Sequence, residues 1–326
     1  MFLKKNSGQV EKLNQAGRFI YGPVLSRRLG LSLGIDILPP KTCNFNCLYC
    51  QLGPTKKIIE KRHPYYRVTD IIEALKTALE HLPRIDYLTF SGSGEPTLNT
   101  HLGRLIREIK QRTTKPVAVL TNSLLLKEKE VREELALADL VVPSLDAAEQ
   151  SLFLQINRPN PAVHIDGIID GLIRFREEFH GQIWLEVMLI KGMNDKPEPL
   201  LKLKDAIAKI RPHKIQLNTV VRPPAEAWVE PLGKEEMVEV SKILGPSAEV
   251  IIEATKRVDL EKRENLENSI LSILKRRPAS EEELASLLSE SKEKVQQVLE
   301  KLLAEKKVQV KDHYHRRQFE YFWKGK

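Results

Sequence analysis

Short apolar runs alternate with longer amphipathic stretches from about residue 31 to residue 220, and this alternation restricts the fold more than any other feature of the chain. The apolar runs are rich in β-branched or aliphatic residues and are bounded by Gly, Pro, Asn or Asp, which predicts strands. Their continuous apolar character is typical of strands buried on both faces of a parallel sheet. We expect strands at Leu31–Leu38, Asp86–Phe90, Pro116–Leu120, Leu140–Pro143, Ile183–Ile190 and Lys214–Val220.

Each predicted strand is followed by a stretch with apolar residues at helical spacing. In the first stretch Ile71, Ile72, Leu75 and Leu79 share one face, and Thr69 is a candidate N-cap. Strand–helix units in series favour an α/β fold, here a partial (β/α)6 TIM-like barrel with its chemistry at the C-terminal ends of the strands. The expected helices are Thr69–His81, His101–Arg112, Lys127–Leu137, Val163–Phe179, Pro197–Ile210 and Lys234–Leu244.

A second domain is expected after the charged stretch near residues 258–264. Three apolar-striped helices precede two short strands there, and Ser280 with Glu283 forms a capping box. This order predicts a winged helix-turn-helix. We therefore divide the chain into a barrel core, residues 1–262, and a winged helix-turn-helix domain, residues 263–326. The expected elements are Asn265–Lys275, a helix from Ser280 to Leu288, a helix that Ser291 opens, and strands at Lys307–Lys311 and Gln318–Trp323.

Composition excludes several classes of protein. With 326 residues, 41% hydrophobic and 29% charged, the chain is long enough for two domains and too apolar to be mainly disordered. No apolar run approaches the roughly 20 residues of a membrane span, and Met1–Gln15 is too polar for a signal peptide. We expect a cytoplasmic protein without a membrane partner. The net charge of +8 permits an anionic partner such as nucleic acid without demanding one.

All three cysteines of the chain, Cys43, Cys47 and Cys50, lie within eight residues, directly after the first predicted strand. An odd, clustered set is a poor disulfide framework. Three thiolates suit three irons of a [4Fe–4S] cluster and leave the fourth iron open for another ligand. Two alternatives stand beside this interpretation. One is structural zinc, with His63 or His81 as a fourth ligand, and the other is three free buried thiols.

The Cys-x3-Cys-x2-Cys spacing, with aromatic Tyr49 just before the last cysteine, resembles the radical S-adenosylmethionine (SAM) superfamily. The run from Ser26 through Gly53 resembles, more narrowly, the Fe–S oxidoreductase group related to the wyosine-forming tRNA enzymes, and the resemblance extends from about Tyr21 to Ala254. It implies a [4Fe–4S] cluster whose open iron chelates the amino and carboxylate groups of SAM. One electron, from a flavodoxin- or ferredoxin-like donor, then cleaves SAM to methionine and a 5′-deoxyadenosyl radical.

The resemblance also implies a SAM site at the strand ends. Ser93-Gly94-Glu95, after the second predicted strand, matches the family's Gly-Gly-Glu segment that binds the methionine amino group. Asn122, Ser144 and Asp146 follow the third and fourth strands, where they suit ribose hydroxyls or the methionine carboxylate, or else cap the next elements. Further candidates are Tyr49 beside the cysteines and Arg158 as a partner of a carboxylate or phosphate. Weaker candidates are Lys191 after the fifth strand, Met188 and Leu217 near the ends of the fifth and sixth strands, and Arg27, Arg28 and Arg222 at the mouth.

The substrate is left open by the sequence. The wyosine-forming group carries further cysteines for a second cluster, whereas this chain has none beyond the triplet, so we do not expect wyosine chemistry itself. From Lys306 to Lys326 there are seven basic and two acidic residues, and a basic wing of this kind could track the phosphate backbone of a nucleic acid. The alternative is a protein-interaction or dimerisation module, because winged helices serve these purposes as well. Three functions remain: a radical SAM enzyme acting on RNA or a nucleotide, one acting on a protein or small metabolite, and an iron–sulfur redox sensor that binds DNA.

Overall fold

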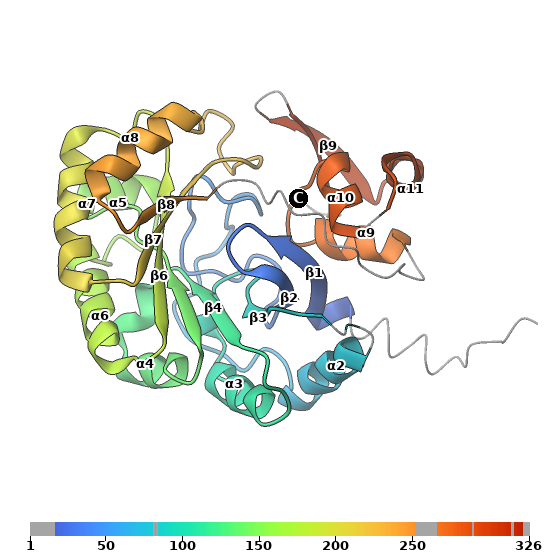
Figure 1. The fold of residues 1–326 in the computed structure, drawn as a ribbon, viewed down its shortest axis with the longest axis horizontal. Coiled ribbons are helices and arrows are strands. Elements are labelled where there is room, and N and C mark those ends of the chain that lie inside the picture. Colours follow the sequence, from blue (N-terminus) through green and yellow to red (C-terminus); the bar gives the residue numbers. More distant parts are fainter. Residues whose placement is uncertain are drawn as a thin grey trace, which may run out of the picture.

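The computed structural model describes residues 17–80, 82, 84–251, 266–288, 290–313 and 316–321. Eight strands form one curved sheet in the order β1-β2-β3-β4-β5-β6-β7-β8, and helices follow one another around its outer side (Figure 1). Strand β1 runs antiparallel to β2, and every later neighbour pair is parallel. Within the described residues β8 does not pair back with β1, so the barrel is partial, as predicted.

The six predicted strands correspond to β2 through β7, with ends shifted by no more than a few residues. Two further strands were not predicted, one at each end of the sheet. Strand β1 contains Gly22-Pro23 and an irregular register, and β8 has only three residues, so neither gives a continuous apolar run. The strands are β1 Ile20–Ser26, β2 Gly30–Ile35, β3 Tyr87–Phe90, β4 Val117–Thr121, β5 Leu140–Pro143, β6 Gln182–Leu189, β7 Lys214–Thr219 and β8 Ala248–Val250.

The predicted helices of the barrel are also present. Helix α2 begins at Val68, so Thr69 lies inside it and is not its N-cap. The helix predicted at Lys127–Leu137 is α4, and Lys127 is the last residue of a 3-10 turn, η2, that precedes it. Helix α5, between β5 and α6, was not predicted. The helices are α2 Val68–Glu80, η1 Pro96–Leu98, α3 Leu102–Lys110, η2 Leu124–Lys127, α4 Lys129–Leu135, α5 Gln150–Ile156, α6 Ile165–Glu178, α7 Pro197–Ile210 and α8 Lys234–Leu244.

The core lies between the sheet and this outer layer of helices. Leu33 and Ile35 of β2 and Leu88 and Phe90 of β3 are fully buried there, as is the apolar stripe of α3. Burial of side chains of this size contributes about 1.5–3 kcal/mol each. This rigid layer fixes the strand ends and hence the loops that follow them. No helix in the described ranges is long and apolar enough to cross a membrane.

The C-terminal module contains the predicted elements. Helices α9 Leu266–Leu274, α10 Glu281–Leu288 and α11 Lys292–Ala304 precede a hairpin of β9 Val308–His313 and β10 Arg316–Tyr321. The predicted capping box is present, since Glu283 N donates to Ser280 Oγ and Ser280 N to Glu283 Oε2. Phe319 packs with the helices in a separate apolar cluster. The winged helix-turn-helix class and the division at residue 262 stay predictions, because the boundary lies outside the described residues.

Candidate active site

The loop that carries Cys43, Cys47 and Cys50, which we call the cysteine loop, follows β2 and is held between two other parts of the barrel. Glu95 N donates to Thr42 O at 3.0 Å, which joins the start of the loop to the end of β3. On the other side Asn46 N donates to Asn157 O at 3.1 Å and Leu48 N to Ile156 O at 3.0 Å. The loop is therefore fixed by backbone bonds, and its three cysteines occupy the C-terminal end of the sheet, where the sequence places them.

Each cysteine sulfur faces a different hydrogen-bond donor. Lys41 Nζ lies 3.0 Å from Cys50 Sγ, Asn157 Nδ2 3.5 Å from Cys47 Sγ, and Asn122 Nδ2 3.7 Å from Cys43 Sγ. Donors of this kind stabilise a thiolate and tune any metal bound to it.

The cysteines are all free and partly buried. Burial raises the pKa of the Cys43 thiol to about 12 and raises that of Cys47 well above its ordinary value. The Cys43 and Cys47 thiols are thus protonated at neutral pH when no metal is bound, and a metal centre must displace those two protons.

The donor set fits an iron–sulfur cluster better than a zinc ion. Zinc needs four ligands around one point, and in the described part of the chain no three Cys, His, Asp or Glu side chains are arranged to hold a single ion. In a [4Fe–4S] cluster each cysteine binds a different iron, so the three sulfurs need not converge so closely. His63 packs against the ring of Tyr65, and His81 lies outside the described residues.

Gly94 allows the strand-end loop to approach the cysteine loop. A Cβ at this position would lie 1.8 Å from Thr42 O, so any side chain would push the two loops apart. Beside it, Ser93 Oγ donates to Asp36 Oδ2 at 2.5 Å. Ser93 N also donates to Asp36 Oδ1, at 3.2 Å, so the hydroxyl and the N–H of Ser93 are both committed to Asp36 and its carbonyl is left to face a ligand.

Glu95 is a buried carboxylate that joins the ends of β3 and β4. Its Oε1 accepts from Thr97 N, Thr97 Oγ1 and Thr121 Oγ1, and its Oε2 accepts from Asn122 N at 2.7 Å. Burial raises the pKa of Glu95, while these donors act in the opposite direction. The carboxylate sets the position of Asn122, whose side chain reaches Asn44 Oδ1 at 2.6 Å beside Cys43.

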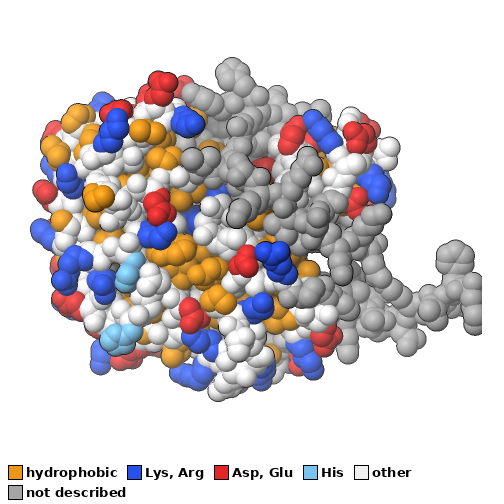
Figure 2. All heavy atoms as spheres, in the orientation of Figure 1, with side chains coloured by type: hydrophobic (Ala, Val, Ile, Leu, Met, Phe, Trp, Pro, Cys, Tyr) orange, Lys and Arg blue, Asp and Glu red, His pale blue; other side chains and the backbone are white. Residues whose placement is uncertain are grey.

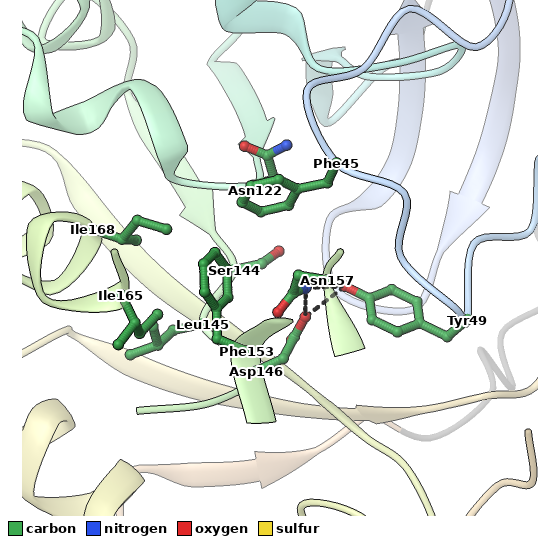
Figure 3. A pocket seen from close by; sticks show the side chains of 10 residues that line it. All are labelled: Phe45, Tyr49, Asn122, Ser144, Leu145, Asp146, Phe153, Asn157, Ile165 and Ile168. Atoms are coloured by element: carbon green, nitrogen blue, oxygen red, sulfur yellow. Dashed lines mark hydrogen bonds between the residues drawn. The ribbon is translucent and has the colours of Figure 1, made fainter. Parts of the chain in front are cut away.

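Tyr49, Asp146 and Asn157 form one hydrogen-bonded network at the end of β5 (Figure 3). Asp146 Oδ2 accepts from Tyr49 Oη at 2.6 Å and from Asn157 Nδ2 at 2.7 Å, and its Oδ1 accepts from Met188 N at 2.9 Å. Burial raises the pKa of Asp146 to about 6 against the effect of these donors, and burial together with Asp146 raises that of Tyr49 well above its ordinary value. The network holds Asn157 against Cys47.

A small cavity of about 10 Å³ lies beside this network, and it has room for little more than one water molecule. Ser144 lines it, and the Ser144 carbonyl accepts from Ser123 Oγ at 2.7 Å. Its polar lining consists of Tyr49, Asn122, Ser144, Asp146 and Asn157, and its apolar lining of Phe45, Leu145, Phe153, Ile165 and Ile168. The predicted residues Tyr49, Asn122, Ser144 and Asp146 are thus brought together from separate loops.

Arg158 has a different environment. Its backbone has a positive φ of 47°, and its guanidinium pairs with Glu226. The preceding residue, Asn157, contacts Cys47 instead, and sequence reasoning missed it. In the sequence Arg158 stands out by its charge, whereas the contact of Asn157 with Cys47 depends on the path of α5. The role proposed for Arg158 stays a prediction.

Of the weaker candidates, Lys191 pairs with Glu236 at 3.0 Å on the surface. Leu217 is fully buried in the core, and Met188 packs against an apolar cluster that includes Leu48.

Comparison with known proteins agrees with this geometry. Residues 37–203 match the model of the radical SAM superfamily. This segment covers half of the chain and contains the cysteine loop and the ends of β3 through β6. The chain belongs to the radical SAM superfamily.

Within that superfamily, the chain is one of the UPF0026 proteins. It is 34% identical to the UPF0026 protein of Methanocaldococcus jannaschii over 83% of this chain and 86% of that one. It is also 41% identical to a protein of Brachyspira hyodysenteriae named GTPase Obg, over 89% of this chain but only 43% of the length of that relative. A radical SAM methyltransferase from Sphaerobacter thermophilus shares the fold, with a TM-score of 0.53 at 20% identity over 67% of this chain and 65% of that one. The narrower resemblance to the wyosine-forming enzymes stays a prediction.

Proposed function

We propose that the chain is a radical SAM Fe–S oxidoreductase that holds a [4Fe–4S] cluster through Cys43, Cys47 and Cys50 and cleaves SAM reductively. The observation that carries this proposal is that three cysteines of one loop each face a separate donor, Lys41, Asn157 or Asn122, at the C-terminal end of the sheet. When bound, the reduced cluster supplies the electron that splits SAM into methionine and a 5′-deoxyadenosyl radical. A one-electron donor of the flavodoxin or ferredoxin class is the partner that this chemistry requires.

The loops after β3, β4 and β5 would bind SAM. The main chain at Ser93 and Gly94 suits the methionine amino group, because Gly94 has no side chain to block the approach and Glu95 adds a negative charge nearby. Asn122, Ser144 and Asp146 suit the polar groups of the methionine and ribose parts. Asp146 would act mainly by holding Tyr49 and Asn157, since both oxygens of its carboxylate already accept hydrogen bonds.

The C-terminal module is in a position to help recognise the substrate. Gln51, next to Cys50, donates to Arg276 O at 3.5 Å, so the module contacts the barrel beside the cysteine loop. We propose a nucleotide-bearing substrate such as RNA, with a protein or small metabolite as the alternative. A DNA-binding redox sensor would not need the polar residues gathered at four strand ends.

An anaerobic assay tests the proposal. The full chain is reconstituted with iron and sulfide, reduced with dithionite, and assayed with SAM for 5′-deoxyadenosine. We expect product from the wild type and from the control Ser151→Ala, which lies on the exposed face of α5, and none from Cys47→Ala. Product formation by Cys47→Ala would contradict the cluster assignment, and a fully loaded wild type without product would favour the redox sensor.

A further inference from the structure

Four arginines meet where the C-terminal module packs against the barrel. Arg27 and Arg28 lie in the turn between β1 and β2, Arg222 follows β7, and Arg277 follows α9. Arg27 lies close enough to Arg222 and Arg28 for their positive charges to repel. Arg222 is likewise repelled by Arg277 and Arg28, and Arg277 is repelled by Arg27. Residues from three distant parts of the sequence thus form one basic cluster, which we call the arginine cluster.

The arginine cluster contains more positive than negative charge. Glu186 pairs closely with Arg28, at 2.7 Å. Glu283 lies 3.6 Å from Arg222 and 3.7 Å from Arg277, beyond hydrogen-bonding distance for both. Among the described residues, Glu186 and Glu283 are the two carboxylates that face the four guanidinium groups. Arg27 forms no ion pair with a described residue.

Several donors in the arginine cluster are also unused. The Nε atoms of Arg222 and Arg277 are buried and have no hydrogen-bond partner. Burial, reinforced by the neighbouring arginines, lowers the pKa of Arg27 and of Arg222 to about 10. Both groups remain charged at neutral pH, so the free protein carries mutual repulsion and unsatisfied donors that an anion would relieve.

The visible surface does not carry a comparable excess of one charge. On the face shown in Figure 2, basic and acidic side chains are interspersed over the described surface, so the net charge of +8 does not form a broad single-sign patch there. The arginine cluster instead borders the candidate active site, because Arg222 Nη1 donates to Gln51 Oε1 at 3.2 Å and Gln51 follows Cys50.

We propose that Arg27, Arg28, Arg222 and Arg277 bind a phosphate group of the substrate. Guanidinium groups bind phosphate oxygens through paired, charge-assisted hydrogen bonds. Among the described residues, two glutamates oppose the four arginines, which leaves two positive charges that a phosphate dianion would balance. The inference rests on the proposed function only in treating this phosphate as part of the substrate; the binding itself requires neither SAM nor reductant.

Binding is measured on the reconstituted full chain without SAM or dithionite. Two probes separate the sources of phosphate: inorganic pyrophosphate, followed by calorimetry, and a fluorescein-labelled single-stranded oligoribonucleotide, followed by anisotropy. We expect Arg27→Gln and Arg222→Gln each to weaken binding by on the order of tenfold. Glu283→Gln keeps the capping geometry but removes a competing negative charge, so we expect tighter binding.

The matched control is Arg67→Gln, because Arg67 is 81% exposed and pairs only with nearby Asp70, and we expect unchanged affinity. The absorbance of the iron–sulfur cluster and the circular dichroism spectrum verify that each variant is folded. If the oligoribonucleotide binds through these arginines, with or without pyrophosphate binding as well, the result supports a nucleic-acid phosphate. If pyrophosphate alone binds, the result supports a small phosphorylated substrate. No binding of either probe, or equal affinity in Arg27→Gln and wild type, would overturn the proposal whatever the outcome of the SAM assay.

Discussion

Two neighbouring arginines of the C-terminal module, Arg276 and Arg277, differ in how completely their charges and hydrogen-bond donors are paired where the module meets the barrel. Arg276 Nε pairs with Asp36 Oδ2 at 3.0 Å, and both side chains are about 5% exposed. Further donors complete the contact, since Arg276 Nη2 donates to Arg18 O at 2.7 Å and Ser93 Oγ donates to Asp36. Arg277 belongs to the arginine cluster, where charges are unequal and its Nε has no partner.

The difference separates a structural contact from a candidate binding site. Buried charges are expensive unless they are paired and hydrogen-bonded. The Arg276–Asp36 contact meets both conditions and joins the module to the loop that carries Ser93 and Gly94. The arginine cluster meets neither condition fully, and sites that sacrifice stability in this way are commonly functional.

The largest effect is expected from breaking the matched contact. Arg276→Met would leave the Asp36 carboxylate buried without its counter-charge, which costs about 3–5 kcal/mol of unfolding free energy. Denaturant unfolding of the full chain measures this loss. The double variant Arg276→Met with Asp36→Asn is the control, and it should recover part of the stability. A loss below about 1 kcal/mol in the single variant would show that the contact is not structural.

A smaller loss is expected in the arginine cluster when a counter-charge is removed. Glu186→Gln leaves Arg28 without its carboxylate and increases the repulsion among the arginines, while Asn218 retains a partner. We expect a loss of about 1–2 kcal/mol in the same unfolding measurement. Unchanged stability would mean that the cluster is balanced by groups other than Glu186 and Glu283.

The smallest effect is expected for Arg27→Gln. The substitution removes a partly buried guanidinium that forms no ion pair with a described residue, so relief of repulsion should offset the lost packing. We expect unfolding free energy within about 0.5 kcal/mol of the wild type, or higher. A loss of about 2 kcal/mol or more would assign Arg27 a structural role like that of Arg276.

The sequence predicts the barrel well because its central strands are continuous apolar runs followed by striped helices. It misses β1, where Gly22-Pro23 interrupts the pattern, and α5, which is short and mixed in polarity. In the site, the cysteines and Asp146 follow from spacing and strand ends. Asn157 and Lys41 do not, because their contacts with Cys47 and Cys50 arise only when the loops pack together.

The arginine cluster was only partly visible in the sequence. Arg27, Arg28 and Arg222 were candidates for the mouth of the barrel, but an isolated arginine at a rim is usually solvent-exposed. Arg277 completes the group only because α9 and α10 pack against β1, a contact between segments more than 200 residues apart in sequence. Charge balance in such a cluster depends on tertiary structure.

In the proposed site, Cys43, Cys47 and Cys50 would hold a cluster with one iron open to SAM. The most direct measurement is the electron paramagnetic resonance spectrum of the reconstituted, reduced full chain, recorded anaerobically before and after addition of SAM. We predict a [4Fe–4S]⁺ signal that changes on addition of SAM, because the fourth iron has no cysteine to occupy it. A cluster signal that is identical with and without SAM would contradict the account.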